Sequence, residues 1–139
     1  MFQSGVNTAM ANQMSQNTMV EHLGIEFIEV GEDYMKAKMP VDHRTKQPMG
    51  LLHGGASVAL AETLGSFAAH CVVDQKTQYC VGLEINANHV KAVKDGWVYA
   101  IAKALHIGKN THIWEIKVTN EEGALVCISR ITMAVMTKK

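Results

Sequence analysis

Apolar and polar positions alternate over most of the second half of the chain. The segments 96–108, 111–120 and 124–137 follow a period of two, which is typical of strands that bury one face. Earlier in the chain, residues 25–41 contain two further runs of this kind, separated by a polar turn from Gly31 to Asp33. These segments together predict five strands.

The segment 79–93 shows the same period and predicts a sixth strand. Its alternation predicts one apolar face, made of Val81, Leu83, Ile85 and Ala87. The opposite face is predicted to hold Gly82, Glu84, Asn86 and Asn88.

Residues 54–73 have a different pattern, which is typical of a helix built from small and apolar residues. This segment contains five alanines and a single charged residue, Glu62. Small side chains allow such a helix to lie close to strands that curl around it. The loop before the helix contains Pro48 and Gly50, which interrupt regular structure.

The amino-terminal part of the chain has weaker signals. Residues 17–24 predict a short helix that ends at Gly24. Residues 1–17 are rich in Asn, Gln, Ser and Met, and they predict a loose terminus or a short helix.

The predicted order is two strands, one long helix and four strands with short connections. Short connections favour antiparallel pairing, and a helix set apart from the strands favours an α+β fold. A chain of 139 residues suits a single domain, which we assign to residues 18–139. Edge strands of antiparallel sheets pair readily between subunits, so we expect a dimer.

Composition narrows the classes of function. Lys and Arg together number 13, as do Asp and Glu, so no overall field attracts nucleic acid or a membrane surface. No apolar run is long enough to span a bilayer. The three cysteines form no C-x-x-C pair, which argues against a zinc site or a disulfide framework. The first 20 residues lack charge and an apolar signal region, so we expect a cytoplasmic protein.

The lone carboxylate of Glu62 has two interpretations. Helical glutamates usually face solvent without a specific role. However, the neighbouring positions at helical spacing are Gly55, Ser66 and His70, which form a polar stripe with no further charge. Such a stripe is also typical of a helix face that borders a pocket or another subunit.

The start of the helix, His53-Gly54-Gly55, has the features of an oxyanion hole. Its backbone N–H groups lack intrahelical partners, and the helix dipole favours negative charge on a nearby oxygen. A simple helix start capped by His53 is the alternative. Gly54 and Glu62 are eight residues apart, about 12 Å along a helix, so one carbonyl group cannot contact both. A site that uses both must combine two subunits.

Three segments, KQPMGLLHGGASVALAETLGS, VGLEINANHVK and LHIGKNTHIWEIKV, occur in this order. Together they resemble the hotdog-fold acyl-CoA thioesterases over residues 18–137. The resemblance is closest to the branch with the 1,4-dihydroxy-2-naphthoyl-CoA thioesterase of menaquinone synthesis and the enterobactin proofreading thioesterase. It implies one long helix wrapped by an antiparallel sheet, and a homodimer with shared active sites that pairs into a tetramer.

The resemblance also implies roles for individual residues. Glu62 corresponds to the catalytic carboxylate, which acts as nucleophile or general base. The N–H of Gly54 and the side chain of Gln47 correspond to groups that bind the thioester carbonyl. His53 corresponds to an imidazole beside them, and Ser66 to a hydroxyl that positions water or the carboxylate. No metal and no cofactor are implied.

The resemblance also implies that coenzyme A binds at Gly82 and at two segments, 89–92 and 106–111. The matching positions are Gly82, His89, Val90, Lys91, Ala92, His106, Ile107, Gly108, Lys109, Asn110 and Thr111. This region carries four lysines and one aspartate between His89 and His112, which suits a phosphate or a solvated basic face. Lys91 stands where relatives carry Arg, so the charge remains without the bidentate fork. His70 and Cys71 are candidates for the acyl pocket.

The expected reaction is hydrolysis of an acyl-CoA, with an aromatic acyl group first. Medium-chain acyl-CoA and thioesters on an acyl or aryl carrier protein are alternative substrates. A hotdog enoyl-thioester hydratase and a non-catalytic binding module for acyl-CoA or carrier protein are alternative functions.

Overall fold

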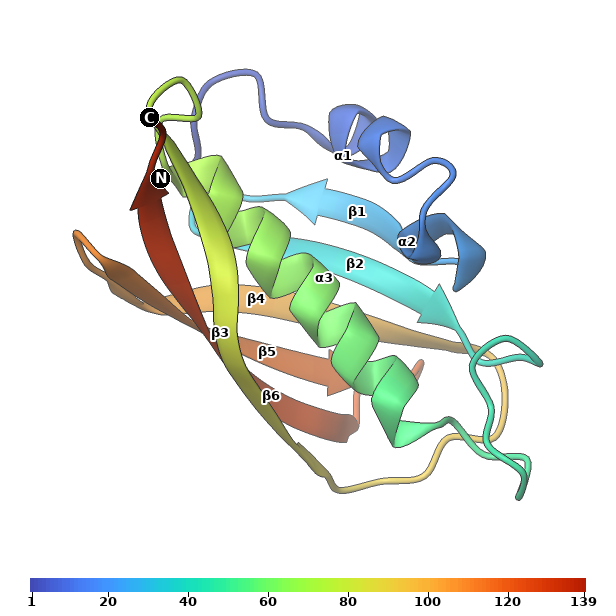
Figure 1. Ribbon diagram of the computed structural model, residues 1–139. Helices are drawn as coiled ribbons and strands as arrows, with labels where there is room; N and C mark the ends of the chain where they lie inside the picture. The colour runs from blue at the N-terminus through green and yellow to red at the C-terminus, as the bar shows by residue number, and fades with distance from the viewer.

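The computed structural model describes residues 1–139 and contains three helices and six strands (Figure 1). In chain order these are α1 (Thr8–Met14), α2 (Met19–His22), β1 (Glu26–Val30), β2 (Tyr34–Pro40), α3 (Gly54–Val72), β3 (Gln78–His89), β4 (Trp97–Ile107), β5 (Thr111–Thr119) and β6 (Leu125–Thr137). The strands form one antiparallel sheet in the order β1-β2-β4-β5-β6-β3. The predicted α+β architecture is confirmed.

The long helix α3 runs diagonally across the concave face of the sheet, which curls around it (Figure 1). Its small residues allow this close approach. A Cβ atom at Gly65 would lie 2.8 Å from Ile131 on β6, so a larger residue here would push the helix away from the sheet. None of the three helices combines the length and the apolar character that a membrane-spanning segment requires.

The short helix predicted over residues 17–24 is present as α2. The Thr18 hydroxyl accepts a hydrogen bond from the Val20 N–H at 3.2 Å and caps the helix start. Gly24 follows the helix with a φ of +75°, a conformation that glycine adopts without strain.

The amino-terminal segment contains a helix, one of the two forms expected from its sequence. The side chain of Asn7 caps α1, and Ala11 is buried. Before the helix, the Phe2 ring stacks on the Trp114 ring with centroids 6.2 Å apart, and the Gln3 N–H donates to the Cys71 carbonyl at 2.8 Å. These contacts attach the terminus to β5 and to the end of α3. The domain boundary at residue 18 stays a prediction.

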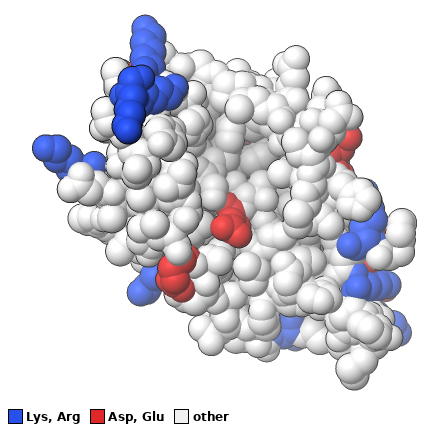
Figure 2. All heavy atoms as spheres, in the orientation of Figure 1, with Lys and Arg blue, Asp and Glu red and all other residues white.

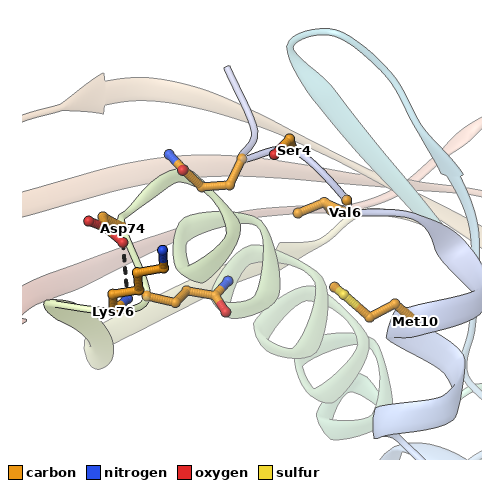
Figure 3. A pocket seen from close by; sticks show the side chains of 8 residues that line it. Ser4, Val6, Met10, Asp74 and Lys76 are labelled. Carbon is orange, nitrogen blue, oxygen red and sulfur yellow. Dashed lines mark hydrogen bonds between the residues drawn. The ribbon is translucent and has the colours of Figure 1, made fainter.

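A surface hollow of about 490 Å³ lies between this terminal segment and the turn after α3 (Figure 3). Ser4, Val6 and Met10 line one side, and Asp74 and Lys76 line the other. The Asp74 carboxylate accepts a hydrogen bond from the Lys76 N–H at 3.0 Å, which orders the turn. None of the predicted site residues lines this hollow.

The predicted alternation along β3 holds for Ile85 and Ala87, which pack against the core, and is wrong for Val81 and Leu83, because the strand contains a bulge. Gly82 pairs with Met133 and Glu84 pairs with Thr132, so Leu83 is an extra residue between consecutive partners. Val81 therefore lies on the opposite face from Ile85, and Val81 and Leu83 are 40% and 61% exposed. An inserted residue of this kind cannot be read from the alternation of apolar and polar positions.

Candidate active site

The loop before α3 holds Gln47 in a tight turn. The Gly50 N–H donates to the Gln47 carbonyl at 2.9 Å, and Gly50 has a φ of +83°. The side-chain oxygen of Gln47 accepts a hydrogen bond from the Met49 N–H. Because Met49 is the donor, the Gln47 atom that faces it must be the oxygen. The amide NH₂ group of Gln47 is therefore left to donate elsewhere.

The first turn of α3 leaves one backbone donor unused. The Nδ1 atom of His53 accepts a hydrogen bond from the Gly55 N–H at 2.8 Å, and the His53 carbonyl accepts from Ala56 and Ser57 at 3.0 and 3.2 Å. The capping interpretation of His53 is therefore confirmed. The N–H of Gly54 makes no hydrogen bond within the chain, so it is free to bind an oxygen of a ligand.

A cavity of about 420 Å³ lies beside this free N–H. Its lining brings together three predicted groups, namely Gln47, Gly54 and the segment 89–92. Its remaining walls are Leu51, Leu52, Ser57 and Val126. We call Gln47, Gly54 and residues 89–92 the Gly54 half-site.

The position of His89 within this half-site was not anticipated from the sequence. His89 ends β3, and the tip of its ring points at the start of α3. A Cβ atom at Gly54 would lie 2.9 Å from the His89 Nε2 atom. The sequence prediction extended this strand to residue 93, whereas β3 ends at His89. A strand that ends at His89 would have suggested that this residue lies near another element.

Glu62 lines a different hollow, of about 260 Å³, together with Ser66 and residues of α2. Its carboxylate is exposed on the single chain, and a Cβ atom at Gly82 would lie 3.4 Å from its Oε2 atom. The Ser66 hydroxyl contacts the Met133 sulfur at 3.8 Å. Figure 2 shows a largely uncharged face around α3, with acidic atoms near its centre. The sequence places one carboxylate on α3, that of Glu62.

The predicted segment 106–111 lies near Gly82, which borders Glu62. Gly82 and His112 both pair with Met133, from the two sides of β6, so the turn between β4 and β5 lies near Gly82. We call Glu62, Ser66, Gly82 and residues 106–111 the Glu62 half-site. One chain therefore separates the predicted residues into two groups, one at the first residue of α3 and one near its middle.

An apolar hollow of about 400 Å³ continues from the Glu62 half-site. It shares Val20, Thr63 and Ser66 with the hollow around Glu62 and reaches Phe67 and His70. His70 lines this hollow, and its role at an acyl pocket stays a prediction.

Cys71 does not line this apolar hollow, so that part of the prediction is wrong. The helix turns the Cys71 side chain into the core, where burial raises the pKa of its thiol to about 12.

The profile described as the thioesterase superfamily matches residues 49–127, which is more than half of the chain. The chain belongs to the thioesterase superfamily. The 1,4-dihydroxy-2-naphthoyl-CoA hydrolase of Escherichia coli is 49% identical over 90% of this thioesterase and 91% of that protein. The proofreading thioesterase EntH of Cronobacter turicensis is 50% identical over 90% of each chain.

Solved structures support the same assignment. A Pseudomonas aeruginosa thioesterase, crystallised as a variant with one Gln replaced by Ala, superposes with a TM-score of 0.97 at 44% identity and 99% coverage of both chains. Two variants of a Staphylococcus aureus thioesterase, 38% identical, give TM-scores of 0.83 and 0.81, covering 86% and 84% of this chain and 99% and 97% of theirs. One has a Glu replaced by Ala, and the other a Gln fifteen positions earlier. The protein has the hotdog fold and hydrolyses thioesters.

Proposed function

We propose that this thioesterase hydrolyses acyl-CoA at sites shared between two subunits. Each site combines the Gly54 half-site of one subunit with the Glu62 half-site of the other. The observation that carries this proposal is the separation of the two half-sites on one chain. Gly54 and Glu62 line different hollows, and eight residues of helix hold them about 12 Å apart.

The open edge of the sheet favours such a dimer. β3 is an edge strand of 12 residues with exposed apolar side chains at Val81 and Leu83. Symmetric antiparallel pairing of two β3 strands would continue the sheet and place two α3 helices side by side in opposite directions. Glu62 of one subunit would then approach Gly54 of the other.

The reaction follows from the groups that meet in this arrangement. The thioester oxygen binds the Gly54 N–H and the Gln47 amide, which stabilise the negative charge that develops on it. Glu62 attacks the carbonyl carbon or removes a proton from the water that attacks it, with Ser66 placing the water or carboxylate. The C–S bond then breaks and its electron pair goes to sulfur. Where Glu62 acts as base, it returns the proton taken from water to the thiolate, and the acid and the thiol leave. Where Glu62 acts as nucleophile, the thiolate takes a proton from solvent, and water then hydrolyses the acyl-glutamyl anhydride and restores the carboxylate. The same chemistry would need no metal or cofactor.

The spacing of the two side chains supports their assignment. In the Staphylococcus aureus thioesterase, the Gln and the Glu that were replaced by Ala are fifteen positions apart. Gln47 and Glu62 have the same separation in this chain.

Coenzyme A would contact both half-sites. The segment 89–92 belongs to the Gly54 half-site, and the turn 106–111 belongs to the Glu62 half-site. The side chains of Lys91, His106 and Lys109 are exposed in these segments and are able to approach phosphate groups.

The acyl group would occupy the apolar hollow that continues from Glu62. Its aromatic walls, Phe27 and Phe67, suit an aromatic acyl group, in agreement with the name of the Escherichia coli relative. A carrier-protein thioester remains an alternative substrate. The sheet face that no helix covers carries three half-buried isoleucines, Ile101, Ile113 and Ile128. We propose that this face joins two dimers into a tetramer.

Subunit complementation tests the shared site. Glu62→Gln and Gln47→Ala should each lose most activity against benzoyl-CoA. Mixed dimers of these two variants contain one site with both changes and one intact site. After unfolding and refolding an equal mixture, we expect about a quarter of wild-type activity, because half of the dimers are mixed.

Two outcomes would contradict the proposal. Near-wild-type turnover by Glu62→Gln would remove Glu62 from the mechanism. An inactive mixture in which native mass spectrometry detects mixed dimers would show that each site lies within one chain.

A further inference from the structure

The imidazole of His89 lies against the start of α3. The ring atoms closest to a Cβ atom built at Gly54 are Nε2, at 2.9 Å, and the two carbons beside it, both at 3.2 Å. The ring therefore directs its Nε2 edge at the α-carbon of Gly54. Only glycine at position 54 leaves room for this contact, because any larger residue would displace the imidazole.

This imidazole has no hydrogen-bonding role within the chain. Neither His89 nitrogen takes part in a side-chain hydrogen bond, although His89 lines the cavity that also contains Gln47 and Gly54. His53 differs, because its Nδ1 atom is occupied by the Gly55 N–H. Of the two imidazoles beside Gly54, His89 is thus the one with both nitrogens available to a ligand.

Three donors consequently face one cavity from the same subunit. They are the Gly54 N–H, the Gln47 amide and the His89 ring, which donates when its proton is on Nε2. Side-chain imidazoles and backbone N–H groups are both able to stabilise a developing oxyanion.

We propose that His89 donates a hydrogen bond from Nε2 to the thioester oxygen, beside Gly54 and Gln47. This inference rests on the proposed function, and it gives His89 a role at the reacting carbonyl instead of the CoA phosphates. A contact with the carbonyl affects every thioester substrate. A contact with phosphate affects only substrates that carry the nucleotide.

The test compares benzoyl-CoA with S-benzoyl-N-acetylcysteamine, which has the same reacting group and no phosphate. His89→Phe keeps a planar ring against Gly54 but has no N–H, and His89→Gln keeps a donor. We expect His89→Phe to lower kcat about 100-fold with both thioesters. His89→Gln should recover part of that loss with both. His43→Ala, which removes an exposed imidazole that does not line the cavity, is the matched control and should leave the rates unchanged.

Three results separate the outcomes. A raised KM for benzoyl-CoA with normal hydrolysis of the short thioester would assign His89 to CoA binding and overturn the inference. Near-wild-type kcat in His89→Phe would show that the ring is only a wall of the cavity. Glu62→Gln is assayed in parallel. Near-wild-type turnover by Glu62→Gln would overturn the proposed function. An inactive Glu62→Gln together with an active His89→Phe would overturn this inference alone.

Discussion

The two edges of the sheet are built in opposite ways. At β1, α1 packs along the edge, and the Asn12 side chain donates to the Phe27 carbonyl at 3.0 Å and accepts from the Phe27 N–H at 2.8 Å. At β3 no segment of the chain covers the edge, and Val81 and Leu83 are exposed. The chain thus closes one edge with its own side chain and leaves the other open, where we propose that a second copy pairs. The covered edge contributes stability, and the open edge is where we place catalysis.

The largest effect should follow from blocking the open edge. Leu83 lies near the middle of β3, so symmetric pairing would bring its two copies close together. Replacing both Val81 and Leu83 by Lys should separate the subunits through like-charge repulsion. Activity should fall at least about 100-fold, because Glu62 is then separated from the thioester carbonyl bound at the Gly54 half-site of the other subunit. Light scattering and thiol release measure the two effects, and circular dichroism checks the fold. An active monomer would contradict a shared site.

A moderate effect should follow at the covered edge. Asn12→Ala removes both hydrogen bonds to Phe27 and leaves its backbone groups unpaired at a part-buried site. The free energy of unfolding in urea should fall by about 1–3 kcal/mol, while the dimer and kcat remain unchanged. Gln13→Ala, one position along the exposed side of α1, is the matched control and should change little. An equal loss in both variants would mean that the hydrogen bonds do not close this edge.

The sequence predicted the elements better than their edges. Periodicity located α3 and the six strands, because apolar residues recur at the spacing of each element over much of its length. It could not detect the extra residue at Leu83, since a bulge changes the pairing and not the composition. Periodicity also could not predict that α1 attaches to β1, because the attachment depends on hydrogen bonds between one asparagine and a distant strand.

The candidate site shows the same limit. From the spacing of Gly54 and Glu62 along one helix we predict that a single chain cannot complete the site, since helix geometry fixes that distance. The approach of His89 to Gly54 depends on where β3 ends and how α3 crosses it. Those features arise from packing of distant segments, which periodicity does not describe.

The smallest effect should come from the charged pair on the covered edge. The Lys38 ammonium lies 3.8 Å from the Glu26 carboxylate, and both side chains are partly exposed. Solvent screens such pairs, so Glu26→Ala should lower the free energy of unfolding by less than about 0.5 kcal/mol. Comparing the loss of unfolding free energy in Glu26→Ala and Asn12→Ala then separates the contribution of the ion pair from that of the asparagine hydrogen bonds. If Glu26→Ala costs as much as Asn12→Ala, surface charge and not the asparagine closes the β1 edge.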